Sequence, residues 1–323
     1  MESKVKLMML LILFILLFSG LGIDQAPKTE ISNGILEASL YLPDAENGYY
    51  RATRFDWSGV ISSLTFEGHT YFGKWFDKYD PLIHDAIMGP VDYFGPLNYD
   101  KAKPGEHFVK IGVGELVKPN NDPYRSFTTY SIADSGSWEI KQQKSRIEFH
   151  HTLNIGSFPY DYVKTIELIE GKPEMLISYK LKNKGSKPIM TQTFNHNFFV
   201  IDNLMLNEDF ELIFNEEVKG EFRNENDLMK FQENKLKFNR KIKRDESVYC
   251  ASITNKNDEA VAYDMRIENR GTGAGVRIIG SLPISNLVFW CRGNTMCPEP
   301  YVDINIEPGK ELSWNIKYEF YTL

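Results

Sequence analysis

The sequence has few cysteines and lacks the common motifs of zinc binding, phosphate binding and serine-nucleophile catalysis. Its 323 residues include three cysteines, and none has the C-x-x-C or Cys/His spacing of a zinc site. There is no G-x-S-x-G nucleophile elbow. The glycine-rich segment 271–275 has neither a G-K-[ST] ending nor a following helical pattern, so a flexible turn is the better interpretation than a phosphate loop. The sequence therefore gives no indication of a metal site.

Positive charge is in the minority. Lys and Arg number 37 against 44 Asp and Glu, which gives a net charge of −7. A protein that holds nucleic acid by neutralising phosphates needs an excess of basic residues, so no nucleic-acid partner is expected. The balance suits a neutral ligand such as a sugar. With 42% hydrophobic and 25% charged residues, the composition is that of a globular protein and excludes a disordered or polytopic membrane protein.

Only the N-terminus has a long apolar run. Lys4 and Lys6 precede an unbroken apolar stretch over 7–18, and the small-residue stretch 19–22 follows. This is the layout of a secretory signal peptide. As a helix the run is ~18 Å long, which is short of the ~30 Å hydrocarbon core of a bilayer. We expect residues 1–22 to be a signal peptide and the protein to be exported to the periplasm or the cell exterior; an uncleaved membrane anchor is the alternative.

The remaining sequence is patterned for strands. Apolar or alternating runs lie at 35–42, 60–66, 137–140, 146–153, 160–169 and 175–181, with turn-forming clusters between them. Helical periodicity is scarce. The segment 226–235 is expected as a short helix or an excursion over the sheet, and 74–107 as a long aromatic loop region. The sequence predicts an all-β protein, a large antiparallel β-sandwich, with residues 27–323 as one domain.

The three cysteines are Cys250, Cys291 and Cys297. An odd number leaves at least one unpaired. Cys291 and Cys297 bracket a short loop, so a bridge between them is one alternative. We favour the other, in which all three are small buried thiols in strands.

Two residues stand out as candidate acid–base groups. His196 lies in the segment F-N-H-N-F-F, between a strand and aromatic residues, and Glu299 lies in C-P-E-P-Y. The prolines on both sides of Glu299 fix the backbone and remove two amide donors. A rigid carboxylate among apolar residues tends to have a raised pKa, which suits a general base near neutral pH. The alternatives stay open: a hydrogen-bonded structural histidine, and an exposed glutamate in a proline-bounded turn.

The aromatic segment 49–57 supplies candidate binding residues. Arg51 and Arg54 are three positions apart, so in an extended segment they face opposite sides. We assign Arg54 to paired hydrogen bonds with sugar hydroxyls, Trp57 and Trp75 to stacking on a sugar ring, and His84 of the long loop to substrate binding. The alternative is a salt-bridged strand with its aromatic residues in the core.

Together these residues resemble the galactose mutarotase (aldose 1-epimerase)-like superfamily, especially its uncharacterised bacterial branches. The segment around His196 resembles the family's Asn-His-x-x-Phe strand, whose histidine is the general acid. The segment around Glu299 resembles the C-terminal segment whose glutamate is the general base. The run 306–314 resembles the last β-hairpin, with Pro-Gly at its turn. The family's Gly-Arg segment is absent: Met88-Gly89-Pro90 stands there, so either Arg54 replaces that arginine or the sugar contact differs.

The resemblance implies an exported isomerase that interconverts sugar anomers without a metal or an organic cofactor. In the implied mechanism, protonated His196 donates to the ring oxygen and ionised Glu299 takes the proton of the C1 hydroxyl, from opposite sides of the sugar. The partner is a mono- or oligosaccharide. Two other hypotheses remain: a non-catalytic carbohydrate-binding module, and a polysaccharide lyase or hydrolase on the same scaffold.

Overall fold

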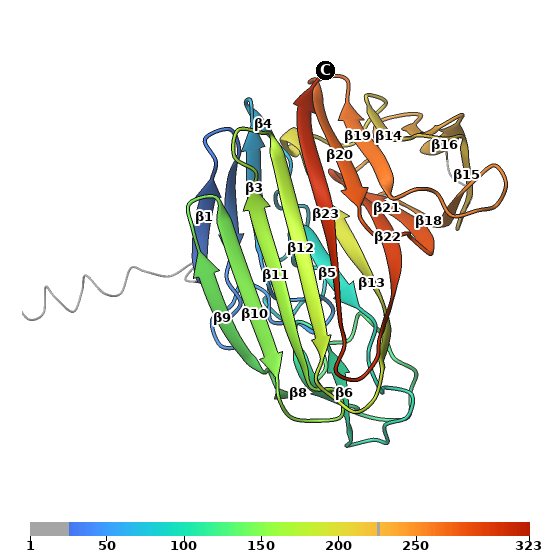
Figure 1. Cartoon of the computed structure of the whole chain (residues 1–323). Coiled ribbons are helices and arrows are strands. Elements are labelled where there is room, and N and C mark those ends of the chain that lie inside the picture. Colours follow the sequence, from blue (N-terminus) through green and yellow to red (C-terminus); the bar gives the residue numbers. More distant parts are fainter. Residues whose placement is uncertain (1–25, 225–226) are drawn as a thin grey trace, which may run out of the picture.

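Two large antiparallel sheets pack face to face in the computed structural model, which describes residues 26–224 and 227–323 (Figure 1). One sheet has ten strands and the other six; a four-stranded and a three-stranded sheet flank them. The only helical element of the described residues is a 3₁₀ turn, η1 (Ile201–Asn203). These same residues contain no helix with the length and apolar character of a membrane span. The segment 1–22, predicted as a signal peptide, lies outside the described residues.

In the two large sheets the strand order differs from the order along the chain. The ten-stranded sheet runs β16 (Met229–Gln232), β17 (Lys235–Phe238), β14 (Phe210–Phe214), β19 (Asp264–Asn269), β20 (Ala274–Gly280), β23 (Glu311–Thr322), β12 (Glu174–Asn183), β11 (Tyr160–Leu168), β10 (Arg146–Leu153) and β9 (Ser137–Gln142). The six-stranded sheet runs β15 (Val218–Phe222), β18 (Ser247–Asn255), β21 (Asn286–Arg292), β22 (Thr295–Ile306), β13 (Ile189–Phe198) and β5 (Gly89–Phe94). The two small sheets are the exception and follow chain order: β1 (Lys28–Ser32), β2 (Glu37–Tyr41), β3 (Val60–Phe66) and β4 (His69–Thr70) in one, and β6 (His107–Lys110), β7 (Gly114–Val117) and β8 (Ile132–Asp134) in the other.

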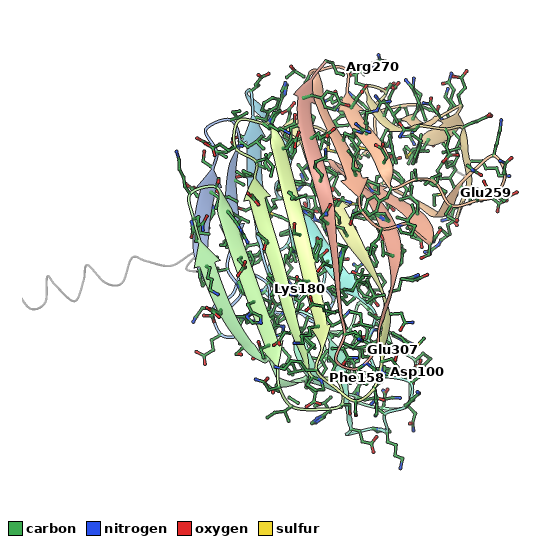
Figure 2. All side chains as sticks on the ribbon, in the orientation of Figure 1. Asp100, Phe158, Lys180, Glu259, Arg270 and Glu307 are labelled. Carbon is green, nitrogen blue, oxygen red and sulfur yellow. The ribbon has the colours of Figure 1, made fainter. Side chains whose placement is uncertain are left out.

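Alternation of apolar and polar residues builds the ten-stranded sheet. In β12, Met175, Ile177 and Tyr179 are buried against the six-stranded sheet, while Lys180 stands on the outer face (Figure 2). Such a period of two fixes which face meets the core. The predicted all-β antiparallel sandwich is confirmed, and β3 and β10 match their predicted bounds.

Two local expectations are wrong. The described part of 226–235 is not helical: β16 and β17 form a hairpin at the edge of the ten-stranded sheet, since Leu236 and Phe238 are buried with the period of a strand. The region 74–107 is not all loop, because it contains β5, which pairs with β13. β5 is buried on both faces and so lacks the alternation that marks a strand in sequence.

All three cysteines are free and buried. A Cys291–Cys297 bridge is therefore wrong, and the buried-thiol interpretation is confirmed. In the β21–β22 ladder Cys291 lies opposite Met296 and Cys297 lies opposite Trp290. Residues directly opposite one another share a face and successive residues alternate, so the two sulfurs point to opposite faces of the sheet.

A charged cluster is buried between the two large sheets. The Lys164 ammonium lies 2.8 Å from Asp92 and 3.7 Å from Asp56, and it donates to the Ser58 carbonyl at 3.0 Å. Burial disfavours the charged amine, but the two carboxylates outweigh it and raise the pKa of Lys164. Asp92 also accepts hydrogen bonds from Tyr179 and Asn195, so one carboxylate joins strands of both sheets.

Lys164→Met is expected to lower the free energy of unfolding by about 3–5 kcal/mol, because it leaves two buried carboxylates without their cation. Urea unfolding followed by circular dichroism measures the change. Lys182→Met, at an exposed position of β12, is the matched control and should change stability by no more than about 0.5 kcal/mol. Equal stability of the two variants would show that Lys164 does not stabilise the two buried carboxylates.

Candidate active site

A cavity of about 920 Å³ lies on the face of the six-stranded sheet that points away from the ten-stranded sheet. The side chains of β13 show on which face of the sheet the cavity lies. Asn195 and Asn197 accept hydrogen bonds from Tyr318 of β23, so they face the interior of the sandwich. Their neighbours Phe194 and His196 point the other way and line the cavity.

An aromatic row crosses the floor of the cavity. Phe194 lies opposite Tyr93 on one side and opposite Tyr301 on the other in the strand ladders. The rings stack, with centroids 4.8 Å apart for Tyr93–Phe194 and 4.3 Å for Phe194–Tyr301. The neighbouring rings cover both faces of Phe194, so the row forms an apolar cavity floor made of ring edges.

His196 and Glu299 meet in the next row. The pairing of β13 with β22 runs to Phe194–Tyr301, and extension of the same register sets His196 opposite Glu299. Their side chains touch, with 3.2 Å between His196 Nε2 and Glu299 Oε1. Two residues that the sequence singled out separately are therefore brought together.

The prolines beside Glu299 interrupt the backbone pairing of β13 with β22. Beyond Phe194–Tyr301 the next bridge between the two strands is Phe199–Met296. Pro298 and Pro300 have no amide hydrogen to donate across the gap. The Asn197 side chain spans it, because its amide donates to the Pro298 carbonyl at 2.9 Å. Asn197 points into the sandwich, where it accepts a hydrogen bond from Tyr318, and it thus also holds the backbone next to Glu299.

Aromatic rings hold the imidazole of His196. Phe198 stacks on it with centroids 3.8 Å apart, and Phe55 and Trp290 meet it edge-on at 5.5 and 5.9 Å. Nδ1 is buried and has no hydrogen-bond partner among the described residues. The ring is therefore oriented by packing and by its contact with Glu299.

Burial suppresses charge on both members of the pair. It lowers the pKa of His196 well below the ordinary value, and the nearby Arg54 guanidinium lowers it further. Burial raises the pKa of Glu299 to about 8; Arg54 opposes this shift and Asp85 adds to it. Both shifts favour a neutral imidazole beside a protonated Glu299 at neutral pH. The distribution expected from the sequence was the opposite one, with His196 protonated and Glu299 ionised.

Arg54 lies in the cavity wall as part of a chain of polar groups. It donates to Asp85, and Asp85 in turn lies 3.1 Å from His84 Nε2. The guanidinium is packed between the rings of Phe55 and Phe127, each about 4.6 Å from it. His84 is absent from the described cavity lining, so it reaches the site through Asp85.

The two predicted stacking tryptophans have different environments. Trp75 lines the cavity, where it stacks on Phe198 and donates its indole hydrogen to the Ile87 carbonyl. Trp57 does not: it is 2% exposed, it is absent from the described lining, and its indole donates to the Ala52 carbonyl. The sugar-stacking assignment of Trp57 is therefore wrong, and this ring belongs to the core.

Sequence reasoning missed several lining residues. Asp85 follows His84 directly, and Tyr301 lies two positions beyond Glu299, hence on the same face of β22. Trp290 also lines the cavity. It belongs to β21, and the sequence of this strand alone does not show which of its faces points toward the cavity. Arg223 and Tyr249 also line the cavity, and the Arg223 guanidinium lies 4.0 Å from the centre of the Tyr249 ring.

The sequence matches no protein-family model and no curated protein. Solved structures do match. The protein Slr1438 from Synechocystis sp. PCC 6803 is 12% identical with a TM-score of 0.53, and the match covers 93% of this chain and 97% of that one. A galactose mutarotase-like protein from Lactobacillus casei is 12% identical with a TM-score of 0.52, and the match covers 91% and 100%. A GalM/aldose epimerase homologue from C. elegans is 14% identical with a TM-score of 0.50, and the match covers 92% and 99%.

The chain has the galactose mutarotase-like fold. The matches extend over nearly the whole length of each of these structures. At these identities the comparison establishes the fold alone, so the chemistry of the site is argued from the residues of this chain.

The raised pKa of Glu299 predicts a pH-dependent stability. A carboxyl whose pKa is higher in the folded protein binds its proton more tightly there than in the unfolded chain. Its stabilising effect is full below the ordinary pKa of 4.5 and is lost as pH rises through about 8. Between about pH 5 and pH 9, the wild type should lose at least ~1 kcal/mol of stability relative to Glu299→Gln.

Urea unfolding at each pH measures this difference. The exposed Glu37→Gln, on β2, is the control for loss of a carboxyl in contact with solvent. Parallel stability curves for the wild type and Glu299→Gln would show that Glu299 is not held protonated.

Proposed function

We propose that this protein is an aldose 1-epimerase-like isomerase in which His196 and Glu299 act as one acid–base unit. The observation that carries the proposal is their 3.2 Å contact in the wall of a cavity, over an aromatic floor and next to Arg54. This combination suits a sugar ring: an apolar surface, a guanidinium for hydroxyl groups and a proton donor beside a proton acceptor.

The contact changes the expected geometry of catalysis. A sugar does not fit between two groups 3.2 Å apart, so both address it from one side. The ring oxygen and the C1 hydroxyl are bonded to the same carbon and are therefore neighbours as well. Glu299 gives its proton to the ring oxygen while His196 Nε2 takes the proton of the C1 hydroxyl. The C1–ring-oxygen bond breaks, and the open-chain aldehyde is left beside a Glu299 carboxylate and a His196 imidazolium.

Ring closure returns the protons. After rotation about the C1–C2 bond, the imidazolium protonates the carbonyl oxygen, the sugar hydroxyl attacks C1 on its other face, and Glu299 recovers the hydroxyl proton. The pair has no net charge before or after either step, which suits a buried site because no isolated charge develops there. Arg54, with Asp85 and His84 behind it, binds hydroxyl groups. We further propose, from residues 1–22, that the protein acts after export.

His196→Gln and Glu299→Gln should each slow anomeric exchange about 10²–10⁴-fold, because each removes one half of the proton transfer. NMR exchange spectroscopy on a panel of aldoses measures the rate. The control is His150→Gln, on β10 of the ten-stranded sheet, which should leave the rate unchanged.

Three results would contradict this proposal. Exchange that persists in both glutamine variants would place the chemistry elsewhere. Sugar binding without any acceleration, undiminished in both variants, would identify a carbohydrate-binding module. Release of products from a polysaccharide would favour a lyase or hydrolase instead.

A further inference from the structure

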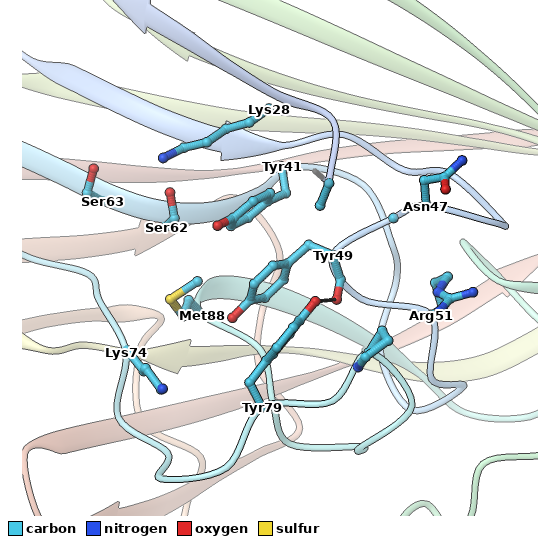
Figure 3. Close-up of a pocket in the computed structure, with 13 residues that line it drawn as sticks. Lys28, Tyr41, Asn47, Tyr49, Arg51, Ser62, Ser63, Lys74, Tyr79 and Met88 are labelled. Carbon is cyan, nitrogen blue, oxygen red and sulfur yellow. Dashed lines mark hydrogen bonds between the residues drawn. The ribbon is translucent and has the colours of Figure 1, made fainter. Parts of the chain in front are cut away.

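A second pocket, of about 670 Å³, lies over the four-stranded sheet, and the proposed reaction does not use it (Figure 3). Lys28, Lys74 and Arg51 line it, and none of the described residues that line it is acidic. No ion pair joins these three cations to a carboxylate within the described part of the chain. Arg51 is close enough to Asp44 to lower the pKa of that carboxyl, so the two lysines carry the excess positive charge of the pocket. In a chain of net charge −7 they make a locally positive site.

The two arginines of segment 49–57 face opposite sides, as their spacing predicts. Arg54 lines the cavity of the His196–Glu299 pair, and Arg51 lines this second pocket. Arg51 Nε is buried and has no hydrogen-bond partner among the described residues. The second pocket thus holds a donor for which the described chain provides no acceptor.

A bulge in β3 turns two hydroxyls into the pocket. Ser39 of β2 pairs with Ser63, but the next residue, Leu40, pairs with Ile61, so Ser62 is extra. Successive strand residues ordinarily face opposite sides, yet Ser62 and Ser63 both line the pocket. Figure 3 shows both hydroxyls on the side of the pocket where the Lys28 side chain extends.

Tyrosines form a flat wall beside these donors. Tyr41 stacks on Tyr49 with ring centroids 4.0 Å apart, and Tyr49 stacks on Tyr79 at 4.6 Å. The Tyr79 hydroxyl donates to the Tyr49 carbonyl at 2.7 Å, which fixes the outer ring (Figure 3). Tyr79 is 40% exposed, so part of the stack is open to a ligand.

We propose that this pocket binds an oxyanion carried on a ring-sized body, with Lys28 and Lys74 supplying the charge, Ser63 a hydroxyl donor, and Tyr79, the exposed outer ring of the tyrosine stack, the surface for the ring. The Ser62 hydroxyl donates to the Ser39 carbonyl and so lines the pocket without donating to the ligand. Ammonium and hydroxyl donors are the groups that hold a carboxylate, sulfate or phosphate. The ligand class is the anion on a ring, as in a uronic acid or a sulfated or phosphorylated sugar. The proposal does not depend on catalysis at His196 and Glu299.

Titration calorimetry at low salt tests the pocket with glucuronate, inorganic phosphate, inorganic sulfate and uncharged glucose as probes. At least one anionic probe should bind saturably at this pocket, and added salt should weaken the binding. Any binding of glucose, at the proposed active site, should be the same in the wild type and in the Lys28/Lys74 variant. Lys28→Gln/Lys74→Gln should lower the affinity about tenfold or more, since it removes two charge-assisted contacts. The control Lys101→Gln/Lys256→Gln removes the same charge from exposed sites outside the described lining and should have no effect.

Further variants separate the two parts of the proposal. Tyr79→Ser should weaken glucuronate and leave the inorganic ions unchanged, because only the ring of glucuronate meets the stack. His196→Gln should leave all anion affinities unchanged, which distinguishes this pocket from the proposed active site. No saturable binding of any anion, or equal binding by the Lys28/Lys74 variant and its control, would overturn the proposal.

Discussion

The register of β13 on β22 is the constraint on which the site depends. Pairs up to Phe194–Tyr301 and the bridge Phe199–Met296 fix the two strands on either side of the proline-bounded gap. Inside that gap His196 and Glu299 have one relative position, with their atoms in contact. Because a strand alternates its faces, the same register aims Asn195 and Asn197 into the sandwich. A shift of one residue would put the interior amides in the place of His196 and Glu299.

The interior of the sandwich supports this arrangement with polar groups. Tyr318 of the ten-stranded sheet donates to both asparagines, and Asn195 donates to Asp92, which in turn pairs with Lys164. A buried network of this kind is stable only when its members are satisfied together, so it specifies one packing of the two sheets. The position of Glu299 is thereby connected to the core through Asn197 and the Pro298 carbonyl.

Burial then determines the chemistry. Rings of Phe55, Phe198 and Trp290 pack against the imidazole, which is buried. In such surroundings a charge is costly, so the proton stays in the neutral arrangement with Glu299 protonated. The Arg54–Asp85 pair adds opposite charges next to the site, and their effects on the pKa of Glu299 partly cancel.

Sequence patterns predicted much of the fold, because alternation and turn residues mark strands such as β3 and β10 directly. They failed for β5, where burial on both faces removes the alternation, and for the β16–β17 hairpin, whose short strands resemble a helical turn in composition. His196 and Glu299 were identifiable from their unusual neighbours. Their contact, the burial of Trp57 and the position of Asp85 were not, since each depends on which distant segments of the chain become neighbours. The protonation state was also beyond the sequence, because it follows from burial.

A double-mutant cycle on anomeric exchange tests the central claim most directly. If one shared proton makes His196 and Glu299 a single unit, loss of either member disables the transfer, and His196→Gln/Glu299→Gln should be no slower than the slower single variant. Groups that act independently would give a double variant whose loss is the product of the two single losses. That multiplicative result would contradict the account.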